Sequence, residues 1–318
     1  MGELLDNRYL VEHKLGFGGG SILWMAHDLE TKQDVAVKVM SSGGWGDNET
    51  RMQGEIIIDH VRDRSHLVTS LASSTLPLAG YEHRALVFPL MGPCLCAPIV
   101  KRISMRTRMS ADKQLLESLR KLHEAGIVHR DVNKRNCMQS KYEALGRPLK
   151  QVIPFVELER KGELVRPVKV PDTLRTEEFH LGDFGLAKKI SSPSTPHGYP
   201  PLQYCSPERL HNHTPTPACD IWRLVPWPSD EPGGPMSGIV KCLGPLPADW
   251  KGSYTHPKGV ESLYDPDLEY EPGCIAYRIS YFVREKNIDP AELQLVIELM
   301  QSLLRDSTFR AIMERYGC

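Results

Sequence analysis

The strongest constraint on the fold is a change of pattern along the chain, from short β-rich runs to longer helical periodicity. Residues 8–40 contain three runs rich in β-branched and aromatic residues, separated by glycine-rich or polar turns. Strands that precede helices in this way are typical of an α+β chain with a small β-rich lobe and a larger, mainly helical lobe. We expect the boundary near residues 91–93. The predicted elements are strands at 9–11, 21–26, 34–39 and 85–88, and helices at 49–61, 109–125 and from Pro290 onward.

The length agrees with two lobes, because 318 residues correspond to about two units at one domain per ~150 residues. A hydrophobic fraction of 41% is enough for a sizeable core, and a net charge of -1 gives no reason to expect nucleic acid or an anionic membrane as a partner. No apolar run approaches the ~18 residues of a membrane span, and the eight cysteines are scattered. The first residues lack the pattern of a signal peptide. We therefore expect an intracellular protein, cytoplasmic or nuclear.

A glycine cluster at residues 16–20 lies between two predicted strands. Glycine lets backbone amides approach phosphate oxygens without a Cβ in the way. A strand after the glycines argues against a dinucleotide-binding fold, which needs a helix there. By itself, the cluster is as compatible with a structural turn. Lys38 stands on an apolar strand 20 residues after Gly18, either as an edge charge or within reach of phosphates beneath the glycines.

Three later motifs carry more specific chemistry. In the segment 129–136, Asp131 can accept the proton of a hydroxyl while Asn136, five residues on, offers an oxygen to magnesium. Asp183, in the Leu-Gly-Asp-Phe-Gly sequence of residues 181–185, can hold metal against phosphates. Ser-Pro-Glu follows at residues 206–208.

Together and in this order, the five motifs resemble the signature set of the eukaryotic protein kinases, over nearly the whole length of the chain. The finer resemblance is to the serine/arginine-rich-protein kinases and their fungal relatives. The segments that carry it are 14–18, 21–26, 203–208, 219–222 and the insertion at 139–178. The resemblance implies a two-lobed α+β kinase fold, with an N-lobe at 8–91, a C-lobe at 92–318 and an activation segment at 183–208.

The resemblance also implies ATP and Mg²⁺ as cofactors and gives residues their roles. Lys38 would hold the α- and β-phosphates and pair with a helix glutamate, for which we take Glu55. Asp131 would be the catalytic base, and Asn136 and Asp183 the metal ligands. The glycines over the triphosphate would be Gly16 and Gly18, and the residues around the base Leu15, Leu23, Ala36, Pro89, Met91 and Met138, with Phe88 as gatekeeper. The implied partner is a protein substrate, and the finer resemblance suggests one rich in arginine and serine.

Two departures concern the hydroxyl that accepts the phosphate. Asn133 stands where serine/threonine kinases carry a lysine, and Arg135 is the candidate substitute, as an arginine is in many tyrosine kinases. Pro201 replaces a threonine of the serine/threonine kinases. We expect serine or threonine as the acceptor, with tyrosine left open. Arg130 is a candidate receiver of an activation-segment phosphate, for which the candidate sites are Ser191, Ser192, Ser194, Thr195 and Tyr199.

The largest departure follows Trp222, where related kinases continue into a long buried helix. Residues 223–235 contain four prolines and two glycines within ten positions, which is incompatible with a helix. Apolar surface exposed by its loss, at ~25 cal/mol per Å², could cost several kcal/mol out of a typical total of ~5–15 kcal/mol. The alternative function is therefore a pseudokinase scaffold. A small-molecule phosphotransferase is a weaker third possibility, because the motif at 204–208 is typical of protein kinases.

Overall fold

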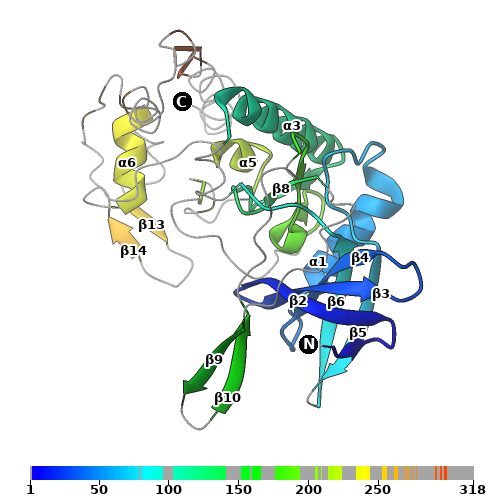
Figure 1. The fold of residues 1–318 in the computed structure, drawn as a ribbon. Coiled ribbons are helices and arrows are strands. Elements are labelled where there is room, and N and C mark those ends of the chain that lie inside the picture. Colours follow the sequence, from blue (N-terminus) through cyan, green and yellow to red (C-terminus); the bar gives the residue numbers. More distant parts are fainter. Residues whose placement is uncertain are drawn as a thin grey trace. The chain divides into compact units, whose positions relative to one another are not determined.

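The structure is a computed structural model of the 318-residue chain (Figure 1). It describes residues 2–78, 80–95, 103–140, 152–157, 160–165 and 176–193. Beyond residue 193 it describes 205–206, 209, 214–223, 234–243, 253–255, 261–263 and isolated positions up to 298.

A six-stranded antiparallel sheet forms the N-terminal part of the chain, with the strand order β1-β2-β3-β4-β6-β5 (Figure 1). It confirms the four strands predicted before residue 90 and adds two. The strands are β1 (Leu4–Leu5), β2 (Tyr9–Gly18), β3 (Ser21–Asp28), β4 (Asp34–Met40), β5 (Ala72–Leu78) and β6 (Tyr81–Pro89).

Strand β4 is apolar without alternation because both faces of the sheet bury side chains. Val35 and Val37 join one buried cluster, and Ala36 joins a second cluster on the opposite face. The neighbouring strand β6 divides in the same way, since Val87 belongs to the first cluster and Phe88 to the second. This follows from the two-residue period of a strand.

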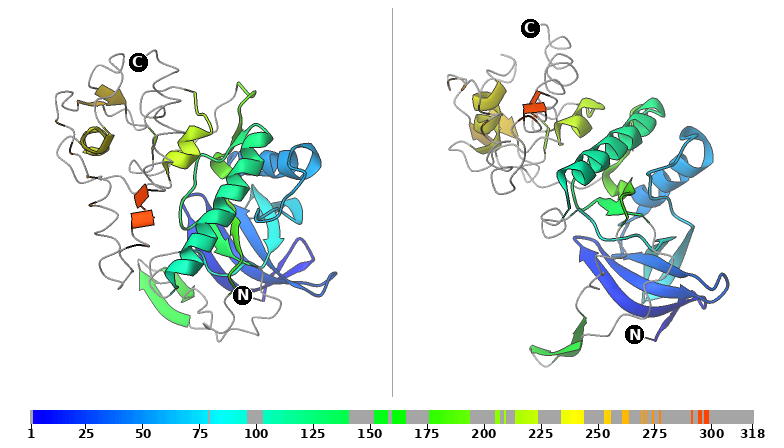
Figure 2. Two further views of the ribbon diagram at one scale, coloured as in Figure 1. Left: turned by 90° about the horizontal axis from the view of Figure 1, so that it is seen from above. Right: turned by 45° about the horizontal axis from the view of Figure 1, so that its top comes forward.

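Two helices accompany the sheet, and Figure 2 shows them from two further directions. Helix α1 (Asp47–Glu55) begins after Gly46, whose φ of 89° suits glycine, and continues as a π-helical turn, η1 (Ile56–His60). Helix α3 (Met105–Glu124) begins four residues before the predicted position, because the Ser104 hydroxyl caps it by accepting a bond from the Thr107 amide. Both predicted helices are thus present, with shifted ends.

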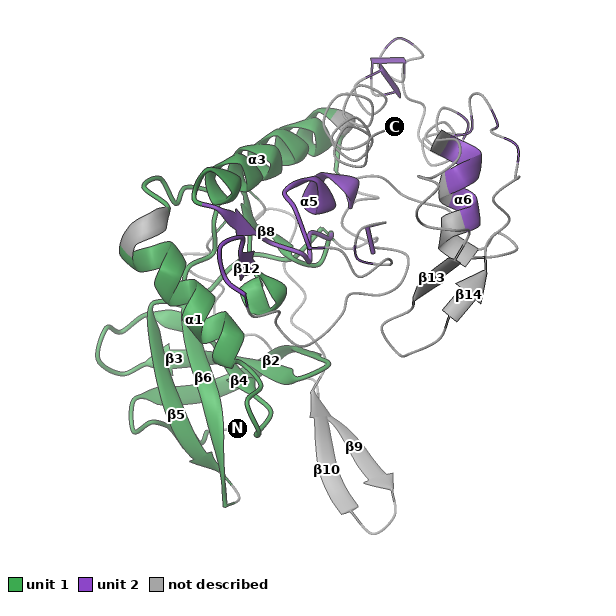
Figure 3. Cartoon of the chain, turned by 180° about the vertical axis from the view of Figure 1, so that it is seen from behind, with its two compact units in different colours: residues 1–125, 134–187 green, residues 126–133, 188–318 purple. Residues whose placement is uncertain are grey.

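The chain forms two compact units (Figure 3). Unit 1 comprises residues 1–125 and 134–187, and unit 2 comprises residues 126–133 and 188–318. The bounds of these units differ from those of the predicted lobes at 8–91 and 92–318, because unit 1 contains residues of both lobes. The lobe boundary therefore stays a prediction. Unit 1 also contains the pair β8 (Cys137–Gln139) and β11 (Phe179–Leu181), the turn η3 (Phe184–Leu186) and the hairpin β9 (Val152–Glu157) and β10 (Arg160–Val165). This hairpin lies within the insertion at 139–178.

In unit 2, strand β7 (Ile127–Val128) pairs with β12 (Lys188–Lys189), and β13 (Ser253–Thr255) pairs with β14 (Glu261–Leu263). Helix α5 (Ala218–Trp222) has only five residues, and the next described helix is α6 (Gly234–Leu243). The proline-rich residues 224–233 and most of the helix predicted from Pro290 lie outside the described residues. Within the described part of the chain, no helix has the length and apolar character that crossing a bilayer requires.

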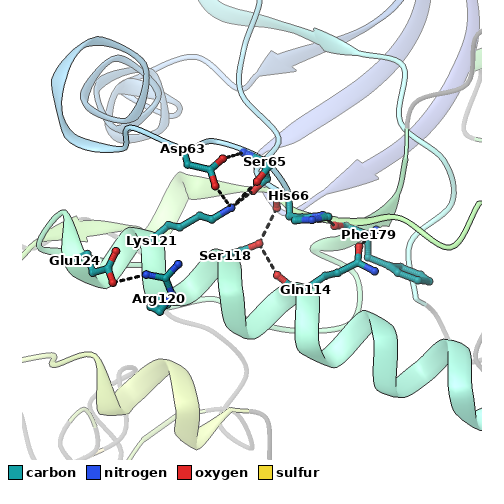
Figure 4. A network of polar contacts seen from close by, with 9 residues as sticks. All are labelled: Asp63, Ser65, His66, Gln114, Ser118, Arg120, Lys121, Glu124 and Phe179. Carbon is teal, nitrogen blue, oxygen red and sulfur yellow. Dashed lines mark hydrogen bonds and ion pairs between the residues drawn. The ribbon is translucent and has the colours of Figure 1, made fainter.

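Helix α3 is tied to the loop before β5 by polar contacts (Figure 4). Lys121 Nζ donates to the Ser65 carbonyl at 3.1 Å and pairs with an Asp63 carboxylate oxygen at 2.8 Å. The Ser118 hydroxyl donates to the His66 carbonyl at 2.9 Å. These contacts fix residues 63–66, directly before Leu67, which forms a β-bridge with Leu181.

The same helix fixes strand β11. The Phe179 amide donates to the Gln114 side chain at 2.8 Å (Figure 4). Leu67 forms a parallel bridge with Leu181, and the Val68 amide donates to the Leu181 carbonyl at 2.8 Å. Two residues after this anchored strand comes Asp183, so α3 and the 63–68 loop together determine where that carboxylate lies.

Candidate functional site

The glycine cluster forms the tip of the β2–β3 hairpin, with Gly18 paired to Ser21. This confirms the strand predicted after the glycines. The Gly20 carbonyl accepts a bond from the Ser41 amide at 2.8 Å, and a Cβ at Gly20 would lie 2.6 Å from the Trp45 ring. Phe17 at the tip is 80% exposed. Any larger residue at position 20 would therefore displace the Trp45 ring.

Lys38 on β4 bridges two carboxylates. Its Nζ donates to Glu49 Oε2 at 2.7 Å and to Asp183 Oδ1 at 2.9 Å. Burial lowers the pKa of Lys38, but the two carboxylates outweigh it, so that pKa lies above its ordinary value. Burial raises the pKa of Glu49, Asp183 adds to this rise, and Lys38 opposes it. The ammonium group is thus held charged between two acids.

The assignment of Glu55 as the partner of Lys38 is wrong, since the structure gives this place to Glu49. Six residues along a helix turn the side chain by about 240° and move it by about 9 Å, so Glu55 lies on another face of α1. A signal was present in the sequence. Glu49 stands three and seven residues before Met52 and Ile56, both fully buried, and therefore belongs to the apolar stripe of the helix.

Asn48 is a residue that the sequence analysis missed. Its side-chain amide donates to the Gly185 carbonyl at 2.8 Å and to the Ala187 carbonyl at 3.0 Å. Gly185 lies within η3 and Ala187 directly follows it, and η3 comes directly after Asp183, whose own backbone is left-handed with φ 65°. Helix α1 therefore holds the lysine through Glu49 and the segment after Asp183 through Asn48.

The two predicted metal ligands come from paired segments. Asn136 directly precedes β8 and Asp183 follows β11, and the Gly182 amide donates to the Asn136 carbonyl at 2.9 Å. Asn136 is buried, whereas the Asp183 side chain is 42% exposed. One amide and one carboxylate are oxygen donors of the kind that Mg²⁺ takes when substrate phosphates complete its shell. The residues present fit a magnesium ion.

The residues predicted around the base also come together. Leu15, Leu23, Met91 and Met138 are partly buried and pack against the cluster that contains Ala36 and Phe88. Because these four side chains are only partly buried, they form an apolar surface that solvent can reach, next to the buried cluster. Pro89, the remaining predicted contact, ends β6 opposite Val35. A Cβ on Gly182 would lie 2.6 Å from the Met138 methyl carbon, so this glycine accommodates Met138.

The loop that carries Asp131 is held in unit 2 by Asp220. Asp220 is completely buried, and its two carboxylate oxygens accept bonds from the amides of His129 at 2.8 Å and Arg130 at 2.7 Å. Arg130 has a left-handed backbone with φ 63°. Such a conformation is costly for a non-glycine residue and persists when its surroundings fix it. Asp220 supplies that fixation.

The Asp131 side chain has a partner that the sequence analysis did not foresee. Arg223 Nη1 donates to Asp131 Oδ1 at 3.0 Å. Asn133, which replaces the family's lysine, donates its side-chain amide to the Asp131 carbonyl at 3.0 Å. Arg135, the proposed substitute for that lysine, is exposed in unit 1, and its role stays a prediction.

Three arginines gather near this loop. Arg130, Arg209 and Arg223 line a small cavity together with Ser206, Pro215 and Cys219. Burial, with repulsion from Arg209 and Arg223, lowers the pKa of Arg130 to about 10. Of the candidate phosphorylation sites, Ser191 and Ser192 are described, and Ser194, Thr195 and Tyr199 lie outside the described residues.

Comparisons with known proteins place these features in a family. Residues 9–225 match the protein kinase domain. The serine/threonine-protein kinase PknL of Mycobacterium tuberculosis is 32% identical over 146 residues, 43% of this chain and 35% of that protein. SRSF protein kinase 3 of Mus musculus is 28% identical over 150 residues, 43% of this chain and 26% of that protein. Protein kinase dsk1 of Schizosaccharomyces pombe is 29% identical over 148 residues, 43% of this chain and 27% of that protein.

This chain thus spans about a third or less of the length of these relatives. The crystal structure of a kinase domain aligns with 99% of this chain and 96% of that chain, with a TM-score of 0.62 and 18% identity, which supports the fold alone. The β-rich N-terminal part and the alignment agree with the expected two-lobed kinase fold. On the match to residues 9–225, which is more than half of its length, the chain belongs to the protein kinase domain family.

Proposed function

We propose that this chain is an ATP- and Mg²⁺-dependent protein kinase that transfers the γ-phosphoryl group to a protein hydroxyl. The observation that carries this proposal is the Lys38–Glu49–Asp183 cluster. It brings together a strand, a helix and the segment after β11, from positions up to 145 residues apart. A structural ion pair would need only one carboxylate, whereas this arrangement presents a lysine and an exposed acid to the same place.

Each residue of unit 1 would bind a different part of the nucleotide. Lys38, kept charged by its two carboxylates, would hold phosphate oxygens. Asn136 and Asp183 would hold magnesium, which supplies positive charge against the developing charge on the phosphoryl oxygens. The apolar surface of Leu15, Leu23 and Met138 would hold the base. Gly16 and Gly18, in the β2–β3 hairpin, would cover the triphosphate.

Asp131 would perform the proton transfer. Its carboxylate accepts the proton of the acceptor hydroxyl, the hydroxyl oxygen forms the new bond to phosphorus, and ADP leaves with the electrons of the broken bond. Asp220 and Arg223 hold this aspartate through its loop backbone and its side chain. A preorganised base is what such a transfer requires.

Serine or threonine in arginine- and serine-rich proteins is the substrate class that we propose. The support is the likeness to SRSF protein kinase 3 and to dsk1. An intracellular location, cytoplasmic or nuclear, fits such substrates and remains part of the proposal. Arginine/serine-rich peptides, compared with tyrosine-containing peptides of equal charge, separate these acceptors.

The alternative is a pseudokinase scaffold, favoured by Asn133 and by the proline-rich sequence after Trp222. An active kinase and a pseudokinase scaffold would share the fold, so nucleotide binding and phosphotransfer must be measured separately. Mg-ATP at ~100 times its dissociation constant adds ~2.7 kcal/mol and raises the melting midpoint by several degrees. A scaffold that binds no nucleotide shows no such rise.

The decisive experiment is phosphotransfer from radiolabelled ATP by the purified chain. We expect activity that Asp131→Asn and Lys38→Met each reduce by at least ~100-fold. The matched control is Glu55→Gln, which removes a charge from the same helix as Glu49 without touching Lys38. Activity that survives Asp131→Asn would refute the role of that aspartate, and a wild-type chain without activity would favour the scaffold.

A further inference from the structure

We propose that Arg223 is a positioning residue for the proton transfer: it holds the Asp131 carboxylate in place from the C-terminal cap of the short helix α5. The inference rests on the proposed function and deepens it. It assigns a role in the reaction to a residue at the edge of the shortened region, where the sequence suggested only that an anchor was missing.

The bond joins a buried cation to a partly exposed acid. Arg223 Nη1 donates to Asp131 Oδ1 at 3.0 Å, and the two side chains are 2% and 20% exposed. The arginine is therefore the fixed end of the pair, and the carboxylate is the end that reaches solvent. A contact of this kind determines which way the carboxylate points and leaves it accessible to a hydroxyl group.

Helix α5 can make this contact because its spacing suits the loop. Asp220 and Arg223 are three residues apart, which places both on one side of a helical turn. The Arg223 amide also donates to the Asp220 carbonyl at 3.3 Å, so the turn is closed between them. Asp220 fixes the loop backbone at residues 129 and 130, and Arg223 fixes the side chain of the next residue.

The surrounding charges explain why the pair stays together. Arg130 and Arg209 line the same small cavity as Arg223. Asp220 accepts a bond from the His129 amide of the loop, and Asp131 accepts a bond from the Arg223 side chain. A guanidinium buried among other cations costs several kcal/mol of stability without a carboxylate partner. The ion pair with Asp131 is therefore favoured over a state in which Arg223 is buried and unpaired.

The first measurement is steady-state kinetics on the full chain with Arg223→Met. Methionine keeps most of the apolar volume and removes the donor. We expect kcat to fall by about 100-fold, as for a misplaced catalytic group, with the KM values for ATP and peptide unchanged. Arg223→Lys restores a charge and a single donor, and it should recover part of kcat.

The matched control is Arg8→Met, which removes another arginine from a buried carboxylate. Arg8 donates two bonds to Asp28, at 2.8 and 2.7 Å. Its loss should lower the melting midpoint and leave kcat as in the wild type. An equal fall of kcat in Arg8→Met and Arg223→Met would mean that lost stability explains both, and it would overturn the positioning role.

A second readout needs no activity. In a double-mutant cycle of Arg223→Met with Asp131→Ala, the melting midpoint of the double variant should fall by less than the sum of the two single falls, because neither charge is left alone. In an active wild type, an additive cycle or an unchanged kcat in Arg223→Met overturns the positioning role alone. A wild type without phosphotransfer overturns the proposed function, and the role falls with it even when the cycle is non-additive.

Discussion

Two buried acids on two short helices hold the two halves of the proposed chemistry, and they do so by different means. Glu49 on α1 contacts a charged side chain, Lys38, and stands in a unit built on a six-stranded sheet. Asp220 on α5 contacts two backbone amides, and β7, the strand of unit 2 that leads into their loop, and its partner β12 have two residues each. Where a sheet already fixes the backbone, one acid is needed only to orient a side chain. Where little regular structure is present, the acid must fix the backbone itself.

The difference also appears in the cost of losing each acid. Without Glu49, Lys38 keeps Asp183 as a partner, so the loss falls on geometry more than on stability. Without Asp220, two amides in a buried loop lose their acceptors, and unsatisfied buried donors are expensive. We therefore expect stability to suffer most in unit 2 and catalysis to suffer first in unit 1. Substitutions at four sites, Asp220, Glu49, Asn48 and Asp28, test and sharpen this contrast.

Asp220→Ala should have the largest effect. Two buried amides lose their acceptors at ~1–3 kcal/mol each, so the free energy of unfolding should fall by about 2–6 kcal/mol, and phosphotransfer should disappear. Urea denaturation gives the first quantity. Asp220→Asn retains one acceptor oxygen and should lose clearly less stability. Equal losses in the two variants would contradict the backbone role.

Glu49→Gln should lower kcat/KM by about 100-fold while the melting midpoint changes little, because Asp183 alone then orients the Lys38 ammonium group and the lysine is less well placed for the phosphates. Glu55→Gln is the matched variant, about 1.7 turns along the same helix, and it should behave as the wild type. Kinetics with ATP as the varied substrate measures both. A wild-type kcat/KM in Glu49→Gln together with a large fall in Glu55→Gln would instead make Glu55 the partner of Lys38.

Asn48→Ala should cost about 1–3 kcal/mol, since two hydrogen bonds to the segment after Asp183 are lost. Asn48→Asp is the sharper change, because it aims a carboxylate at two carbonyl oxygens and should destabilise more than alanine. Thermal unfolding ranks the two variants. Alanine and aspartate with the same midpoint as the wild type would show that α1 does not hold this segment.

The smallest effect concerns the pH dependence of stability and the Arg8–Asp28 ion pair at the end of strand β3. The hydrogen bonds from Arg8 hold the pKa of Asp28 below its ordinary value. A lowered pKa stabilises the fold above the ordinary value near 4, and this stabilisation is lost as the pH falls below it. The stability gap between wild type and Asp28→Asn should therefore be largest near pH 6 and narrow towards pH 3. A gap independent of pH would mean that the charge of Asp28 contributes nothing.

Most of the local structure was predictable because it depends on residues near one another in sequence. The three strands before residue 40 follow from β-branched runs between turns, and α3 follows from its leucine stripe. The glycine hairpin was predicted for the same reason, since a strand follows the glycines directly. The strands β1 and β5 were missed. The other errors lay at element ends, where the Ser104 cap extended α3 and a π-helical turn ended the helix that begins at Asp47.

The sequence by itself determined the family signature and the identity of Lys38, Asn136 and Asp183 as residues that belong together. Their order along the chain is specific enough without any coordinates. Only the tertiary structure decided that Glu49 rather than Glu55 contacts Lys38, that Asn48 holds the segment after Asp183, and that Arg223 contacts Asp131. The last two join residues 137 to 139 and 92 positions apart. Such contacts depend on the rotational phase of a helix and on which elements pack together, and neither is encoded in a local pattern of residue types.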